Sequence, residues 1–475
     1  MYIWNKESLK SALNDELVYI NENIDFNITN VVFDSTRSGK NSLFVAKKGE
    51  RTDGHKFIKN ALENGAFVLA EYVLEEELNN NPKIIIVKNT VQAMEKMAVY
   101  RRDELKGKVI GITGSLGKTT TKDLVFSTLN LFGKTSCNIQ SFNNYIGVLT
   151  TIINTPADTE YAIFEIGMNN PGELRPLAKL VRPDISIITN IEPAHLGCFN
   201  NIDEIAFEKS EILPETKELA ILNLDNKYYK FLEEKAINNN LKVFNFGKNK
   251  DANVVLEDYS INSEYIDVKY NVFGEKFNAN FNNLDINVVF NSLAVIAVVK
   301  YLNLDVKMAI NGLSKQECSR GRNNLEKVKY INNKDQILNL NIINGTYNAV
   351  NPKAFNSGFE LMKNFKNFNN KICIFGPIKE AGEKTDEFHL SLKDKIIDCG
   401  ANIVVLFSEE MKILYDALKE TNIKLYYFDN YEKIIENIDN IVNDNDLIFI
   451  KSSKSSKTYK IFNYLNKNNP MDLFV

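Results

Sequence analysis

The sequence has few of the residues that would reveal a function immediately. It has five cysteines in 475 residues, scattered and with no C-x-x-C pair, which predicts free thiols in a reducing compartment rather than a disulfide framework. Its formal net charge is −4, so no global basic field attracts nucleic acid or an anionic membrane. We therefore expect no nucleic-acid partner, and we expect anionic ligands to be held by local groups.

Long apolar segments are also missing. Residues 293–299 form one of the longest nearly apolar runs, far below the ~18 residues that a membrane-spanning helix needs. Residues 1–7 lack the apolar core of a secretory signal. We expect a cytoplasmic protein that does not span a membrane, and a monomer.

The composition is that of a folded protein, with 44% hydrophobic and 25% charged residues. At roughly 150 residues per domain, the length suits three domains, which we place at residues 1–85, 86–315 and 316–475. The fold class is α/β: a small mixed N-terminal domain, a central parallel sheet with flanking helices, and a C-terminal Rossmann-like domain.

Apolar runs alternate with helical stretches through most of the chain, as in parallel sheets covered on both faces. Strands are predicted at 31–33, 42–46, 67–70, 84–87, 108–113, 161–166, 184–190, 337–343, 371–375, 402–407, 424–428 and 446–450, with helices at 90–105 and 119–131. Residues 252–281 alternate differently and predict a small antiparallel ribbon.

A glycine-rich turn joins the strand at 108–113 to the following helix. Such a turn wraps phosphate with backbone N–H groups, while Lys118 reaches the terminal phosphates and the Thr119 hydroxyl ligates Mg²⁺. Ile112 stands where the longer P-loop pattern has glycine, so the match is to a shorter G-x-x-G-K-T form. The alternative is a helix entry with a solvated lysine. The predicted phosphate-binding residues are Gly114, Ser115, Gly117, Lys118, Thr119 and Thr120.

Three further side chains are candidates near the same sheet edge. Glu165 ends a buried strand, where a carboxylate is costly to bury unless it meets a cation, so it is a candidate Mg²⁺ ligand or else a solvated edge residue. His195 is one of only three histidines and follows another strand; the alternative is a loop histidine that caps a helix. Lys209, taken alone, is a solvated lysine on a helix.

Several segments then fit one known family in order and spacing. The segments 114–122, 141–148, 165–173 and 182–196 resemble the ATP loop and the following motifs of the Mur ligase family. Within the first domain, 34–37 and 44–58 resemble the UDP-sugar-binding module of its D-alanyl-D-alanine-adding members, which folylpolyglutamate synthases lack.

The resemblance implies an ADP-forming ligase that uses Mg²⁺-ATP to activate the carboxylate of UDP-MurNAc-tripeptide as an acyl phosphate, which the amine of D-alanyl-D-alanine then attacks. It implies catalytic roles for Lys118, Glu165, His195 and Lys209. It also implies metal ligation by Thr119, Glu165, His195 and Lys209, the last after carbamoylation by CO₂. Further nucleotide contacts are expected at Asn287, Asn291, Arg320 and Arg322, and substrate contacts at Ser35, Arg37, Lys48, Asp53, His55, Asn143, Asn144, Tyr347, Asn348 and Lys451.

The third domain departs from the family pattern. Residues 344–349 resemble D-D-S-Y-N-A, but Gly345 stands where an orienting Asp is expected; similarly, Ile286 replaces a His and Pro377 an Asp. Two alternatives therefore stay open: a degenerate, non-catalytic homologue that still binds nucleotide or UDP-precursor, and a sister ligase acting on another precursor or on a folate.

Overall fold

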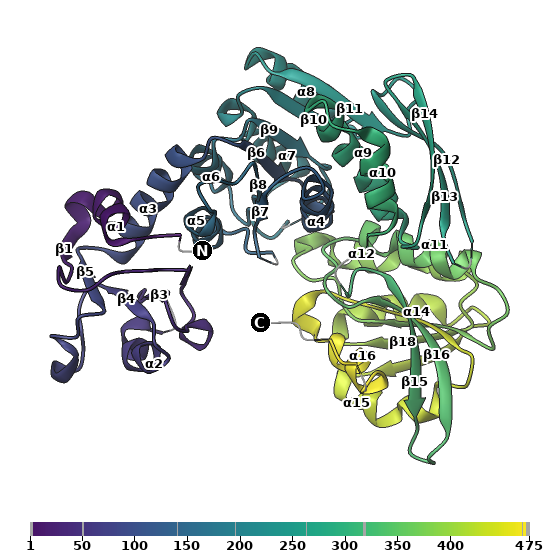
Figure 1. Ribbon diagram of the computed structural model, residues 1–475. Coiled ribbons are helices and arrows are strands. Elements are labelled where there is room, and N and C mark those ends of the chain that lie inside the picture. Colours follow the sequence, from purple (N-terminus) through teal and green to yellow (C-terminus); the bar gives the residue numbers. More distant parts are fainter. Residues whose placement is uncertain are drawn as a thin grey trace.

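The computed structural model describes residues 3–49, 52–139, 141–194, 196–262, 264–316, 320–467 and 469–471. Three sheets follow one another along the chain, of five, nine and six strands, and the middle one lies between the other two (Figure 1). The predicted α/β class is confirmed. The domain boundaries after 85 and 315 stay predictions.

The N-terminal sheet has the strand order β1-β5-β4-β3-β2. Its strands β2 to β5 run parallel, and β1 pairs antiparallel with β5, so the sheet is mixed. The main-chain N–H and C=O of Val31 bond the Asn154 amide, which seats this sheet on the middle domain. The elements are α1 (Lys6–Leu13), β1 (Leu17–Tyr19), β2 (Asn30–Val32), β3 (Ser42–Val45), α2 (Ile58–Glu63), β4 (Phe67–Ala70), β5 (Ile84–Val87) and the connecting helix α3 (Thr90–Glu104).

The middle sheet carries the predicted phosphate loop. Strands β6 to β11 are parallel and lie in the order β11-β10-β9-β6-β8-β7. Buried apolar clusters cover both faces of the sheet. Three of its strands, β7, β10 and β11, were not predicted. The elements are β6 (Lys108–Thr113), α4 (Lys118–Leu129), β7 (Thr135–Cys137), α5 (Tyr145–Asn154), β8 (Tyr161–Glu165), α6 (Leu174–Val181), β9 (Ile185–Ile188), α7 (Ile202–Ser210), β10 (Leu219–Asn223), α8 (Tyr229–Asn238), β11 (Lys242–Gly247), α9 (Ile286–Tyr301) and α10 (Val306–Ser314).

The predicted antiparallel ribbon is confirmed as β12 (Val254–Ile261), β13 (Ile266–Val272) and β14 (Glu275–Phe281). It is not separate, because β12 pairs parallel with β11 and so extends the middle sheet. The Tyr259 hydroxyl donates to Glu360 Oε1 at 2.7 Å. The ribbon therefore reaches the third domain.

The third sheet has the order β15-β16-β20-β17-β18-β19, parallel except for β15. Apolar clusters on both faces make it doubly wound. Gly345 at the end of β16 pairs with Lys451 at the end of β20, at the edge facing the middle domain. The elements are β15 (Asn324–Ile331), β16 (Ile337–Gly345), α11 (Asn356–Asn364), β17 (Lys371–Phe375), α12 (Thr385–Leu390), α13 (Lys393–Asp398), β18 (Ile403–Phe407), α14 (Lys412–Leu418), β19 (Lys424–Phe428), α15 (Tyr431–Asn437), β20 (Leu447–Lys451) and α16 (Tyr459–Leu465).

Two predictions from composition can be compared with the structure. The four described cysteines, Cys137, Cys198, Cys373 and Cys399, are free thiols. No helix in the described part of the chain is long and apolar enough to cross a bilayer.

Candidate active site

The predicted phosphate loop has the required strand–turn–helix geometry. β6 ends at Thr113, and α4 begins at Lys118 after Gly117, whose φ of +79° is left-handed. Gly114 also has a positive φ, and a Cβ there would stand 1.9 Å from the Thr189 hydroxyl, so only glycine fits. The N–H groups of the first turn of α4 are thereby left for an anion.

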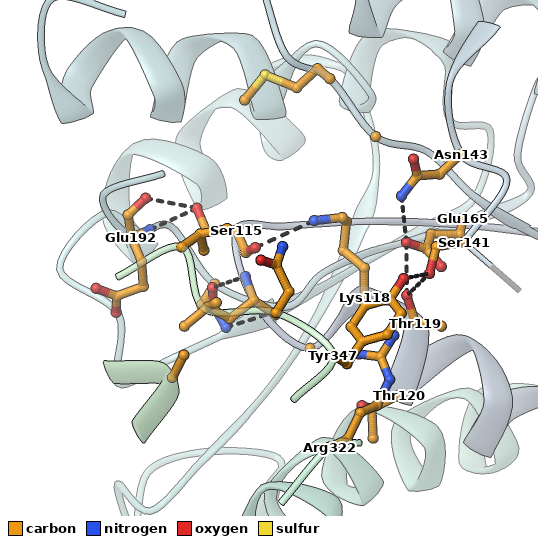
Figure 2. A pocket seen from close by; sticks show the side chains of 18 of the residues that line it. Ser115, Lys118, Thr119, Thr120, Ser141, Asn143, Glu165, Glu192, Arg322 and Tyr347 are labelled. Atoms are coloured by element: carbon orange, nitrogen blue, oxygen red, sulfur yellow. Dashed lines mark hydrogen bonds between the residues drawn. The ribbon is translucent and has the colours of Figure 1, made fainter. Parts of the chain in front are cut away.

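Lys118 lies over this loop. Its ammonium donates to the carbonyls of Gly114 (2.8 Å) and Ser115 (3.3 Å), as Figure 2 shows in part. Burial lowers the pKa of Lys118, and the nearby Glu165 carboxylate opposes that shift. Both acceptors are neutral carbonyls, so the lysine can exchange them for phosphate oxygens.

The strand end after β9 holds the loop in shape, a role that the motifs alone did not reveal. The Thr189 hydroxyl donates to the Leu116 carbonyl at 2.6 Å, and the Leu116 N–H donates to Asn190 Oδ1 at 2.9 Å. The Ser115 hydroxyl donates to the Glu192 carbonyl at 2.8 Å. The 114–117 turn is therefore preorganised before any ligand binds.

Glu165 is buried at the end of β8, facing the start of α4. Its Oε1 accepts from the Thr119 hydroxyl (3.1 Å) and the Asn143 amide (2.6 Å). Its Oε2 is buried with no hydrogen-bond partner among the described residues. The Ser141 hydroxyl, which was not predicted, bridges Thr119 (3.0 Å) to the Tyr347 hydroxyl (2.6 Å) of the third domain.

This oxygen set fits a hard divalent cation. A buried carboxylate oxygen without a partner is costly, and a hydroxyl beside it completes a pair of the oxygen donors that Mg²⁺ prefers. No three His, Cys, Asp or Glu side chains gather into a ligand set within the described ranges, which suits Mg²⁺ because it keeps several waters and phosphate oxygens. His195 lies outside the described residues.

Lys209 is buried on α7, which excludes the solvated alternative; it does not line the cavity described below. Burial, and next the Lys118 charge, bring the pKa of Lys209 well below its ordinary value of 10.5. Its neighbour Glu208 accepts the N–H groups of Gly172 (2.9 Å) and Leu174 (2.8 Å), which fixes the 170–174 loop.

A cavity of about 1080 Å³ opens between the middle and third domains. Gly114 and Arg320, like Lys209, are not part of its wall. The predicted residues that line it are Ser115, Gly117, Lys118, Thr119, Thr120, Asn143, Asn144, Glu165, Asn287, Asn291, Arg322, Tyr347, Asn348 and Lys451.

The structure distinguishes two arginines of the third domain that the sequence alone could not tell apart. Arg322 lies 4.1 Å from the Tyr347 ring centroid and faces the cavity, whereas Arg320 turns to Glu326 and Asn469. On the other side, Asn291 of α9 packs on the phosphate loop, since a Cβ at Gly117 would be 2.9 Å from its Oδ1.

None of the five N-terminal candidates lines the cavity. His55 is buried: its Nδ1 bonds Asp53 Oδ1 (2.6 Å) and its Nε2 accepts the Glu71 N–H (3.1 Å), so both ring nitrogens are occupied. Asp53 accepts the Tyr72 hydroxyl as well (2.6 Å), and these bonds, the tyrosine's first, hold the pKa of Asp53 well below its usual range.

Asp53 also forms a β-bridge with Lys48, so Asp53 and His55 hold the 52–55 segment beside Lys48. Ser35 is buried, and Arg37 lies 5.5 Å from the ring centroid of Phe142, beside the cavity-lining Ser141 and Asn143. Among the five N-terminal candidates, Arg37 is therefore the one best placed to contact a ligand that enters the cavity.

Comparison with known proteins matches all three parts of the chain. Family models match at 27–108 (Mur ligase family, catalytic domain), 112–299 (Mur ligase middle domain) and 331–454 (Mur ligase, glutamate ligase domain). The UDP-N-acetylmuramoyl-tripeptide–D-alanyl-D-alanine ligase of Rickettsia prowazekii is 33% identical over 97% of this chain and 99% of its own. The chain belongs to the Mur ligase family.

Other Mur ligases agree in sequence and fold. The ligase of the same name from Borreliella burgdorferi is 30% identical over 89% of this chain and 90% of its own. MurF from Acinetobacter baumannii superposes with a TM-score of 0.82 at 23% identity, covering 97% of this chain and 98% of that one. MurF from Thermotoga maritima, solved in complex with ADP, has a TM-score of 0.76 at 27% identity, covering 92% and 97%.

Proposed function

We propose that the protein is an ADP-forming ligase that joins D-alanyl-D-alanine to UDP-MurNAc-tripeptide during peptidoglycan precursor synthesis. Its full-length relatives carry this activity in their names. One observation carries the proposal: a single cavity brings together the phosphate loop, Arg322 of the third domain and the Glu165 oxygen that has no partner among the described residues. A site built of those parts suits phosphoryl transfer between two anions.

In the first step, a tripeptide carboxylate oxygen attacks the γ-phosphorus of ATP, the bond to the ADP oxygen breaks, and an acyl phosphate forms. Two anions must meet, so their charge has to be neutralised where they react. Lys118 and the N–H groups of α4 supply positive potential on one side of the cavity and Arg322 on the other. Asn291 of α9 packs against the loop at Gly117.

In the second step, the dipeptide amine attacks the acyl carbon, the tetrahedral intermediate collapses with loss of phosphate, and the nitrogen gives up a proton. The acyl phosphate must be kept from water until the amine arrives. The cavity lies between two domains, and the Ser141–Tyr347 hydrogen bond joins its two walls. Docking of the third domain therefore encloses the intermediate.

Thr119 and Glu165 would hold a Mg²⁺ ion, which neutralises charge on the transferring phosphate. We include Lys209 as a carbamate-forming residue. A neutral lysine amine adds to CO₂ to give a carbamate and a proton, and burial, which lowers the pKa of Lys209, favours that neutral form. The product is an anion that balances Lys118.

Binding of the UDP-sugar is proposed for the face of the N-terminal domain that carries Arg37, with Ser35 and Lys48 nearby in the chain. Asp53 and His55 act indirectly, by holding the 52–55 segment beside Lys48. Asn143 and Asn144 lie between that domain and the phosphate loop, where the peptide has to pass.

Phosphate release by the purified protein tests the function. The assay contains Mg²⁺-ATP, bicarbonate, UDP-MurNAc-tripeptide and D-alanyl-D-alanine, each omitted in turn. We expect release only when both the precursor and the dipeptide are present. Binding of nucleotide or precursor without release identifies a non-catalytic homologue, and release with glutamate and a folate acceptor instead identifies a sister ligase.

A further inference from the structure

The space beside Gly345, at the edge of the cavity, is occupied by the side chain of Asn323. A Cβ at position 345 would stand 2.4 Å from Asn323 Oδ1 and 3.1 Å from the Ile450 carbonyl. Asn323 precedes β15 with a left-handed φ of +62° and is 4% exposed. The amide of Asn323 therefore lies where the family motif would place an acidic side chain.

Lys451, also buried, is bound by this amide. Its ammonium donates to Asn323 Oδ1 (3.3 Å) and to the carbonyls of Gly345 and Asn348 (both 3.2 Å). All three acceptors are neutral, and the described part of the chain contains no salt bridge to Lys451. A buried ammonium without a carboxylate needs compensation from elsewhere.

The Asp285 carboxylate of the middle domain supplies this compensation through a chain of hydrogen bonds. The Ser357 hydroxyl accepts from the amides of Asn323 (2.7 Å) and Asn287 (2.8 Å), which leaves its own hydrogen for Asp285. Asp285 is the buried N-cap of α9 and also accepts the Asn287 N–H at 2.9 Å.

We propose that Asp285, Ser357, Asn323 and Lys451 form an interdomain relay that replaces the acidic side chain absent at 345 and positions the 345–348 turn for ligation. The inference deepens the proposed function and rests on it. The turn matters because the hydroxyl of its Tyr347 contacts Ser141, which contacts Thr119 at the start of α4. The relay thus sets the distance between the third domain and the phosphate loop.

Charges around the relay are consistent with this role. Burial lowers the pKa of Lys451 to about 7, the Asp285 charge opposes that shift, and Arg322 adds to it. Burial raises the pKa of Asp285 to about 6 against its hydrogen bonds and the Lys451 charge. Each residue favours the charged form of the other across the domain boundary.

The test uses Asn323→Gly, which removes the amide without backbone strain because glycine accepts a positive φ. We expect kcat to fall by about tenfold or more, with the affinity for UDP-precursor unchanged, since misplaced catalytic groups cost rate rather than substrate binding. The matched control is Asn303→Gly, an exposed left-handed asparagine after α9 that lies outside the cavity, which should keep wild-type kcat.

The deciding variant is Asn323→Gly/Gly345→Asp. With Asn323 gone, an Asp at 345 would have its Cβ 3.2 Å from the Lys451 ammonium, and we expect it to restore most of the lost kcat. Gly345→Asp alone should lower the melting temperature and kcat, because the new side chain would clash with the amide of Asn323. Full activity of Asn323→Gly, or no recovery in the double variant while it remains folded, would overturn the relay.

Failure of the ligase assignment would look different. In that case the wild-type protein releases no phosphate, yet the coupling between positions 323 and 345 can still be read from thermal unfolding. We expect Gly345→Asp to lower the melting temperature much more in the wild-type background than in Asn323→Gly. Equal shifts in both backgrounds would refute the relay independently of catalysis.

Discussion

The two walls of the cavity are built by different means. The phosphate-loop wall is contiguous in sequence and held within one domain, by bonds from Thr189 and Asn190 to the 114–117 turn. The third-domain wall is assembled from residues 323, 347 and 451, far apart in the chain, and is anchored on Asp285 of another domain. The first wall is rigid by local geometry, while the second depends on domain docking.

The difference explains where the family pattern is kept. The loop cannot change without losing its fit, because Gly114 and Gly117 have no room for a Cβ. The third-domain wall only has to deliver a cation and a tyrosine to the right place, which several side-chain combinations can do. The presence of glycine at 345, where the family motif has an acidic residue, is therefore compatible with an intact site.

The largest effect is expected on the phosphate-loop wall, from Lys118→Ala. Loss of the loop cation should lower kcat by ~10³-fold, about 4 kcal/mol of transition-state stabilisation. The measurement is substrate-dependent phosphate release, with UDP-precursor binding by calorimetry as the control for folding. A variant retaining more than about a tenth of the wild-type rate would mean that Arg322 and the α4 N-terminus carry the charge without the lysine.

Lys209→Met should separate activity from stability. The side chains are similar in length, and exchanging a buried amine for an apolar group should leave the free energy of unfolding unchanged or raised. We expect kcat to fall by about 100-fold, about 2.7 kcal/mol. A ¹³C NMR carbamate signal after addition of labelled bicarbonate should be present in wild type and missing in the variant. If both proteins give the same spectrum, carbamoylation at this lysine is excluded.

The pH dependence of stability probes the third-domain wall. The Lys451 pKa of about 7 in the folded protein lies below its ordinary 10.5, so the unfolded chain binds more protons between these values. The free energy of unfolding should then rise with pH from about 7 to about 10, by up to ~1.4 kcal/mol per unit from this group. Lys451→Met should flatten that rise in urea unfolding, and parallel curves would show that Lys451 is solvated.

The walls also differ in how far they could be predicted from sequence. The loop and Glu165 follow from strand-end positions, because each belongs to one short segment, whereas Lys209 was expected only from the resemblance to the Mur ligase family. Ser141 and Asn323 could not be predicted in the same way. Ser141 contacts Tyr347 of another domain, and Asn323 contacts Ser357 and Lys451, which are distant in the sequence; no local pattern encodes such contacts. Strands β7, β10 and β11 were also missed. β10 is buried throughout, whereas β7 and half of β11 are only partly buried or exposed, and no motif marked any of the three.

The smallest effect is expected from removing a tyrosine hydroxyl. Two such hydroxyls join the middle domain to the third domain. Tyr347 reaches Ser141 inside the cavity, whereas Tyr259 of the ribbon reaches Glu360 outside it, at similar distances of 2.6 and 2.7 Å. Removing one hydrogen bond costs ~1 kcal/mol, so Tyr347→Phe should lower kcat by about fivefold if the bond matters in the transition state. Tyr259→Phe should lose similar stability but leave kcat within about twofold. Equal losses of kcat would mean that domain docking as a whole limits the rate, and the third-domain wall would then have no special contact with the phosphate loop.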